Sequence, residues 1–152
     1  MDVDLGEMVR DSRCISIQLQ SRGNRALAQE GLTEVQARVL LFIMAHAPEG
    51  VSPTDVHREL NFSLAAASGI IKRLREKGYV RVEAYRLDER RKLLFATDKG
   101  RRARDVMDAA LRAIPEQLYR GFTPEELGTL MRLQKKMLAN LADTEVHSIL
   151  EG

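Results

Sequence analysis

Apolar residues recur at helical spacing along most of the chain, and breaks in that pattern divide it into six segments. Residues three, four and seven positions apart lie on one face of an α-helix, so each segment predicts an amphipathic helix. We expect helices over residues 4–29, from Thr33 to about 47, from Ser52 to 60, from Ser63 to 78, from about 101 to 120, and from Thr123 onward. Gly23 interrupts the first pattern and predicts a bend there.

Capping residues fix most of these boundaries. Thr33-Glu34-Val35-Gln36 and Thr123-Pro124-Glu125-Glu126 are capping boxes, in which the first and fourth side chains satisfy free N–H groups of the first turn. Ser52-Pro53-Thr54-Asp55 places a proline at the first helical position, where its missing N–H costs nothing. Gly78 lies at the C-terminal end of the helix that begins at Ser63, where a left-handed cap favours glycine.

Two short runs rich in β-branched and aromatic residues follow the fourth helix, at Tyr79–Tyr85 and Lys92–Thr97. The polar segment Arg86–Arg91 joins them, so we expect an antiparallel hairpin with a long charged turn. Before it, Asn61-Phe62 is a tight connection between two helices. The predicted fold is therefore mainly α with a small β-wing (α+β), a winged helix-turn-helix with helices on both sides.

Basic charge is concentrated in this region. Residues 58–104 hold fourteen Lys and Arg against six Asp and Glu, a balance of +8, whereas the whole chain carries only +2. A basic patch of this kind is the footprint of a phosphate-backbone partner. The alternative interpretation is an ordinary solvated surface.

The wing region contains Asp88-Glu89-Arg90-Arg91-Lys92, followed by Leu93–Thr97 and Gly100, and it is preceded by Leu74–Val80. The first stretch is similar to the wing motif of MarR-type bacterial transcription regulators, and Leu74–Val80 is similar to the end of that family's recognition helix. The likeness in layout runs over residues 31–100. The resemblance implies a dimeric, sequence-specific regulator that binds double-stranded DNA and acts as a repressor, with a DNA-binding region over 33–100 and dimerisation helices over 1–32 and 101–152.

Helix-turn-helix geometry and the resemblance together select the DNA-contacting candidates. The resemblance implies that Arg90 enters the minor groove and that Asp88 pairs with an arginine to hold the loop. Gly69 stands where the resemblance would place an arginine or another polar residue, so direct base readout should be sparse and more of the specificity should come from DNA shape. Capping or close packing is the alternative role for several of these residues. The candidates are Ser52, Thr54, Ser63, Ala65, Ala66, Ser68, Lys72, Arg73, Arg86, Asp88, Arg90, Arg91 and Lys92.

The terminal helices carry more apolar surface than a solitary helix needs, which favours a two-fold homodimer reading an inverted repeat. The resemblance further implies a small aromatic or phenolic effector, bound between the dimerisation helices and the winged region. Candidates for that pocket are Cys14, Ile17, Met44 and His46, for which core packing is the alternative role.

The amino-acid composition bears on which other classes of protein the chain could belong to. One cysteine and three scattered histidines predict neither a disulfide nor a metal site, and no cofactor motif or catalytic constellation is present, so we expect no enzyme. No apolar run of membrane-spanning length or secretory segment is seen, which predicts a cytoplasmic protein without membrane partners. Two alternatives stay open: a thiol-redox regulator using Cys14, and a winged helix serving protein contacts.

Overall fold

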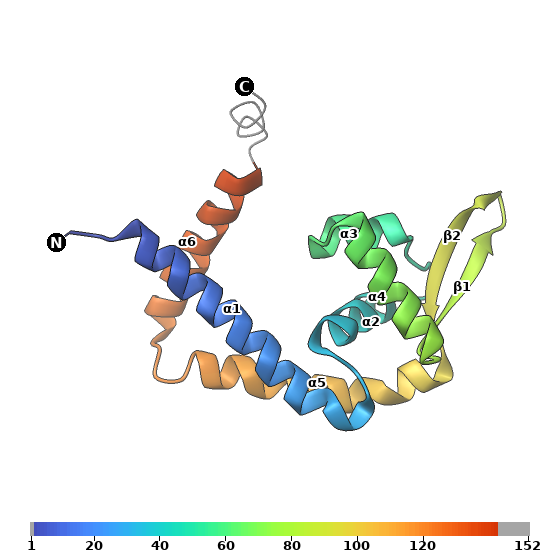
Figure 1. Cartoon of the computed structure of the whole chain (residues 1–152), viewed down its shortest axis with the longest axis horizontal. Coiled ribbons are helices and arrows are strands. Elements are labelled where there is room, and N and C mark those ends of the chain that lie inside the picture. Colours follow the sequence, from blue (N-terminus) through green and yellow to red (C-terminus); the bar gives the residue numbers. More distant parts are fainter. Residues whose placement is uncertain (1, 143–152) are drawn as a thin grey trace. The chain divides into compact units, whose positions relative to one another are not determined.

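A computed structural model describes residues 2–142, apart from the side chain of Glu89. It is mostly helical with one two-stranded antiparallel sheet, which confirms the predicted fold class (Figure 1). In chain order the elements are α1 Leu5–Leu27, the 3-10 helix η1 Ala28–Glu30, α2 Glu34–Ala45, α3 Pro53–Leu60, α4 Leu64–Glu76, β1 Val80–Tyr85, β2 Asp88–Ala96, α5 Asp98–Leu118 and α6 Pro124–Ala142.

The predicted capping residues are found at the helix starts. Thr33 and Gln36 exchange both bonds of a capping box at α2, each 3.2 Å long. At α4 the Ser63 hydroxyl accepts the Ala66 amide at 3.1 Å, and Gly78 follows that helix with φ +80°. Because caps act over three or four residues, the local sequence suffices to position them.

Two glycines permit close approach between elements. α1 continues without interruption through the buried Gly23, where a Cβ would lie 2.5 Å from Cγ of Glu34. Gly100 lies inside α5, which begins at Asp98 and thus three residues earlier than predicted. A Cβ at Gly100 would lie 2.5 Å from the Tyr79 carbonyl oxygen. Both positions therefore require glycine for packing.

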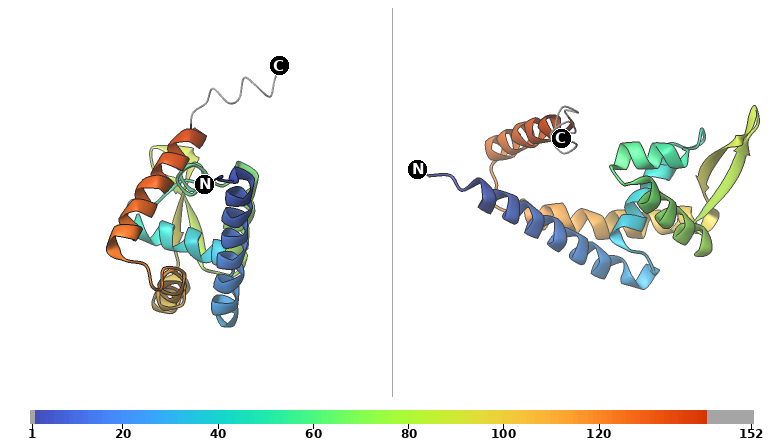
Figure 2. Two further views of the ribbon diagram at one scale, coloured as in Figure 1. Left: turned by 90° about the vertical axis from the view of Figure 1, so that its left-hand side faces the viewer. Right: turned by 45° about the horizontal axis from the view of Figure 1, so that its top comes forward.

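The hairpin differs from the prediction at its turn. β2 begins at Asp88, so only Arg86 and Leu87 connect the strands, and the expected six-residue polar turn is wrong. The strands project from the helices as a narrow wing (Figure 2). At its base Val51 pairs with Leu94, with the Leu94 amide 2.7 Å from the Val51 carbonyl oxygen. This bridge ties the segment before α3 to the wing.

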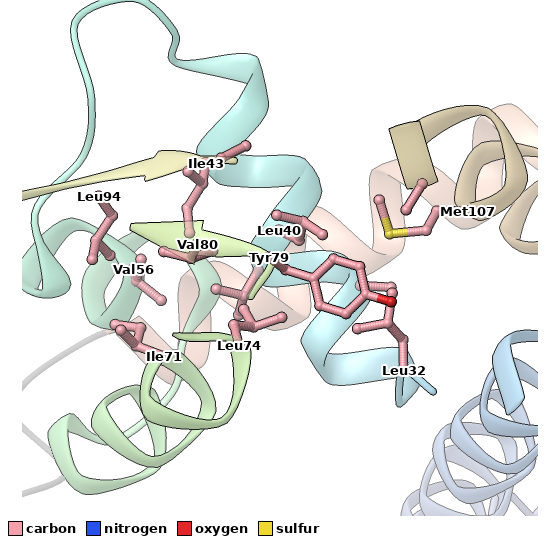
Figure 3. Packing of buried hydrophobic residues seen from close by; sticks show 14 of the residues in the cluster. Leu32, Leu40, Ile43, Val56, Ile71, Leu74, Tyr79, Val80, Leu94 and Met107 are labelled. Carbon is pink, nitrogen blue, oxygen red and sulfur yellow. The ribbon is translucent and has the colours of Figure 1, made fainter. Parts of the chain in front are cut away.

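One apolar cluster holds the winged helix-turn-helix together (Figure 3). Leu40 and Ile43 of α2, Leu74 of α4 and Leu94 of β2 are fully or almost fully buried in it. Met107 of α5 extends the same cluster. Because every element from α2 to α5 contributes, the orientation of α4 relative to the wing is set by this shared core.

The chain forms two compact units, one through Ile114 and one from Pro115. In the second unit α6 begins with the predicted capping box, in which Thr123 and Glu126 exchange bonds of 2.9 and 3.1 Å. α6 exposes large apolar side chains, including Met131 and Leu138 at 61% and 57%. Over residues 2–142, no helix combines the length and apolarity needed to cross a bilayer.

Candidate nucleic-acid interface

The helix α4 has one buried and one exposed face. Ala67, Ile71 and Leu74 face the core, at spacings of four and three residues. The other face leaves the candidates Ala65, Ala66, Ser68, Lys72 and Arg73 exposed. α4 is the second helix of the helix-turn-helix, and the major groove of DNA is wide enough to admit an α-helix. The exposed face of α4 can therefore enter that groove.

The two ends of this exposed face differ in chemistry. From Leu64 to Ile71 the sequence is Leu-Ala-Ala-Ala-Ser-Gly-Ile-Ile, with Ser68 as its single polar side chain. Lys72 and Arg73 follow, and the Lys72 ammonium lies 4.0 Å from Glu76 Oε1, in the direction of the helix C-terminus. The first two turns are therefore smooth and uncharged, and the cations lie beyond them.

The wing contains an irregularity next to its turn, and Arg90 and Arg91 lie in it. Ala84 pairs with Lys92 and Tyr85 pairs with Asp88, so the register shifts and residues 89–91 have no paired partner in β1. Extra residues in one strand re-aim side chains. Arg90 thus lies in this irregular stretch of β2, whereas the turn itself exposes Arg86.

Asp88 stabilises the irregular stretch of β2 by a hydrogen bond to the backbone. Its Oδ1 accepts the Arg90 amide at 3.0 Å. The expected ion pair between Asp88 and an arginine is not formed among the described side chains, so the implied role needs correction. An aspartate accepting an amide two residues later is the usual Asx arrangement in tight turns. Arg91 lies over the Tyr85 ring, 5.6 Å from its centroid.

An open depression of about 500 Å³ connects the wing to the start of α3. It brings together five candidates that are far apart in sequence, namely Ser52, Thr54, Arg90, Arg91 and Lys92. It also contains Pro53, Asp55 and Arg58, of which Arg58 was not among the predicted contacts. We call this surface the basic depression. Four cations and one carboxylate line it, which gives it the electrostatic character of a phosphate site.

Asp55 keeps its charge in the basic depression because of its own local bonds. The Ser52 amide donates to Asp55 Oδ2 at 2.9 Å, and Arg58 Nη2 donates to Oδ1 at 2.9 Å. The backbone bond from Ser52, together with the Ser52 hydroxyl and Arg58, lowers the pKa of Asp55 below its usual 3.8. Ser52 Oγ also accepts the Asp55 amide at 3.1 Å, so the two residues cap the start of α3 reciprocally.

A second cavity, of about 590 Å³, lies among the end of α2, the sheet and the start of α5. Of the four effector candidates, Met44 lines it, whereas His46, Cys14 and Ile17 do not. The His46 Nδ1 atom is 2.8 Å from the Phe42 carbonyl oxygen, and Cys14 is exposed on α1. Within residues 2–142, no three His, Cys, Asp or Glu side chains gather as a metal site requires.

The helix pair α3–α4 and its wing define a winged helix-turn-helix protein. Residues 30–91 match the model of the MarR family. The HTH-type transcriptional regulator TtmR of Methylorubrum extorquens (strain PA1) is 31% identical over 124 residues, covering 79% of this chain and 62% of TtmR. The chain is therefore similar to MarR-type winged helix-turn-helix proteins in sequence and fold. Proteins of that family are DNA-binding transcription regulators and not enzymes.

Solved structures share the fold. A putative MarR family transcriptional regulator from Listeria monocytogenes, complexed with a 26mer DNA, superposes with a TM-score of 0.83 at 24% identity, over all of this chain and 96% of that one. The S. aureus MepR–DNA complex gives 0.83 at 20% identity, over 91% of this chain and 99% of that one. The chain spans 62% of the length of its curated relative, TtmR.

Proposed function

We propose that this protein is a homodimeric transcription repressor that binds an inverted repeat in double-stranded DNA and is released by a small molecule. The observation that carries the DNA-binding part is the basic depression. Arg58 comes from α3, and Arg90, Arg91 and Lys92 come from β2, so two separate elements direct cations to one surface. DNA complexes of the Listeria and S. aureus structures support the same reading.

The proposed binding mode assigns different tasks to the three elements. The exposed face of α4 enters the major groove, and the wing reaches the adjacent minor groove with Arg86 and Arg90. The basic depression receives the phosphates between the two grooves, where the α3 N-terminus adds its partial positive charge. Phosphate contacts fix the register of the protein on the duplex, and base contacts give the sequence preference.

Arg58→Ala tests the basic depression at the residue that the sequence did not single out. We expect duplex affinity to fall roughly tenfold, because a charge-assisted contact contributes about 1.5–3 kcal/mol. The slope of log K against log salt should become shallower by about one unit, as one phosphate contact is lost. Fluorescence anisotropy on the duplex upstream of the gene, over a salt series, measures both quantities.

Arg112→Ala is the matched control, since Arg112 is an exposed arginine of α5 outside the basic depression. It should leave both affinity and slope unchanged. A scrambled duplex separates specific from general attraction. If neither duplex binds even at low salt, the DNA-binding proposal is refuted and a role in protein contacts takes its place.

The ligand-responsive part of the proposal rests on the second cavity. Arg81, Arg101 and Arg104 line it together with Glu83 and Phe95, and the Arg81 guanidinium lies over the Phe95 ring, 4.9 Å from its centroid. An aromatic acid or phenolate matches this lining in charge and shape. The wing strands and α5 both contribute walls, so an occupant that fits one arrangement better would shift the wing relative to α5.

Arg104→Ala should desensitise the protein to such ligands. Arg101 is held by the Ala96 carbonyl oxygen at 2.8 Å and by Asp98, whereas Arg104 has the looser pair with Asp108 at 3.8 Å. Arg104 is therefore the cation most available to a carboxylate. Across a panel of benzoic and phenolic acids, we expect the concentration for half-release of DNA to rise about tenfold, with ligand-free affinity unchanged. Identical release curves for Arg104→Ala and wild type would contradict the assignment.

A further inference from the structure

The start of α4 exposes apolar groups that no part of the described chain covers. Leu64, the first residue of the helix, is 61% exposed, and Ala65 and Ala66 beside it are exposed as well. Around Gly69, one turn further on, a Cβ would meet no atom within 4 Å. Apart from the Ser68 hydroxyl, the first two turns therefore form an apolar surface on the element proposed to enter the major groove.

Hydrogen-bonding side chains are scarce on this surface. The side chains that read purines by paired hydrogen bonds are Arg, Lys, Asn and Gln, and residues 64–71 contain none of them. The Ser63 hydroxyl already accepts the Ala66 amide as the helix cap. Lys72 lies eight residues beyond Leu64, about 12 Å along the helix axis, with its ammonium near Glu76.

The remaining major-groove feature that an apolar surface can distinguish is the thymine 5-methyl group. We infer that Leu64, Ala65 and Ala66 read thymine methyl groups, and that each half-site presents adjacent A·T pairs to them. This inference rests on the proposed DNA-binding function and adds the chemistry of the bases. Small side chains and Gly69 also let the helix backbone approach the groove closely, so that the methyl groups lose contact with water.

Uracil substitution tests the inference directly, since deoxyuridine differs from thymidine only by this methyl group. The preferred duplex is first selected by the full-length protein from a randomised pool. Each thymine of one half-site is then replaced by uracil. We expect roughly threefold to fivefold weaker binding for each contacted methyl, at two or more neighbouring positions, and no change at flanking positions.

A second variant links the effect to the helix. Leu64→Ala removes no core contact and retains a good helix former, so folding should be preserved. In this variant the ratio of thymine to uracil affinity should fall towards one at the position that Leu64 covers. Leu87→Ala is the matched control, because Leu87 is also exposed, at 85%, but lies in the wing turn. The wing is proposed to occupy the minor groove, where no methyl group is presented, so this ratio should persist.

The outcomes separate the two levels of the proposal. A uracil penalty that Leu64→Ala reduces, and Leu87→Ala does not, supports thymine-methyl readout. A selected duplex that binds with steep salt dependence but shows no uracil penalty overturns this inference and leaves the DNA-binding function intact. A pool from which no sequence is enriched overturns the proposed function itself.

Discussion

Replacing Arg90 and Arg91 together by alanine is expected to weaken binding to the operator duplex by about two orders of magnitude. Both residues lie in the irregular stretch of β2 and both line the basic depression. Two lost charge-assisted contacts at about 1.5 kcal/mol each give roughly this factor. The salt slope should fall by about two units, since two fewer counterions are released.

The folded state should tolerate this change, because both arginines are exposed and neither belongs to the apolar cluster. Thermal unfolding of the double variant should therefore match that of the wild type. A control with Arg112 and Arg120 replaced by alanine removes two exposed arginines outside the basic depression and should bind as wild type. An unchanged salt slope in the Arg90 and Arg91 variant would remove the wing from the interface.

The sequence predicted features that depend on neighbouring residues and missed those that depend on distant ones. The predicted caps at Thr33 and Ser63 were correct, because each side-chain oxygen accepts from an amide only three residues further along the chain. The turn of the wing was wrong because Arg86–Arg91 has the polarity of a loop. Pairing with β1 nevertheless extends β2 down to Asp88, and cross-strand pairing is not encoded in local composition.

The candidate site shows the same division. Arg58 was counted as the first residue of the basic region 58–104, but the residues around it in sequence did not indicate that its side chain would share a surface with Arg91. That proximity depends on the bridge between Val51 and Leu94, which joins the start of α3 to the wing across more than forty residues. The second cavity likewise combines Met44 with Arg81 and Arg104 from three separate elements. Neither grouping could be predicted without the tertiary fold.

Exposed apolar surface at both ends of the chain is the basis of the proposed dimer. In α1, Leu5 and Ile17 are 73% and 66% exposed, and in α6 Leu141 is 83% exposed. Apolar side chains of α6 recur at helical spacing and thus form one stripe. The stripe comprises Leu127, Leu130, Met131, Leu133, Met137, Leu138 and Leu141. A second copy of the chain is the partner that two-fold symmetry and an inverted repeat both favour.

Leu138→Glu should therefore convert the protein into a monomer and reduce operator affinity by about two to three orders of magnitude. A buried, unpaired carboxylate in the stripe opposes association, and its symmetric copy doubles the penalty. Each monomer would then engage a single half-site and lose the gain in effective concentration that a linked second head provides. Sedimentation equilibrium measures the association state, and anisotropy on full and half operators measures the affinity.

Ala139→Glu provides the comparison on the same helix. Ala139 lies about 100° around α6 from Leu138, on the face that carries Arg132, Lys135 and Lys136, so an added glutamate there meets opposite charge. This variant should remain dimeric and bind the full operator as wild type. If Leu138→Glu also stayed dimeric with full affinity, the α6 stripe would not be the dimer interface. If it became monomeric yet kept full operator affinity, one winged domain would suffice for recognition, and the inverted-repeat model would fail even though the interface was correctly placed.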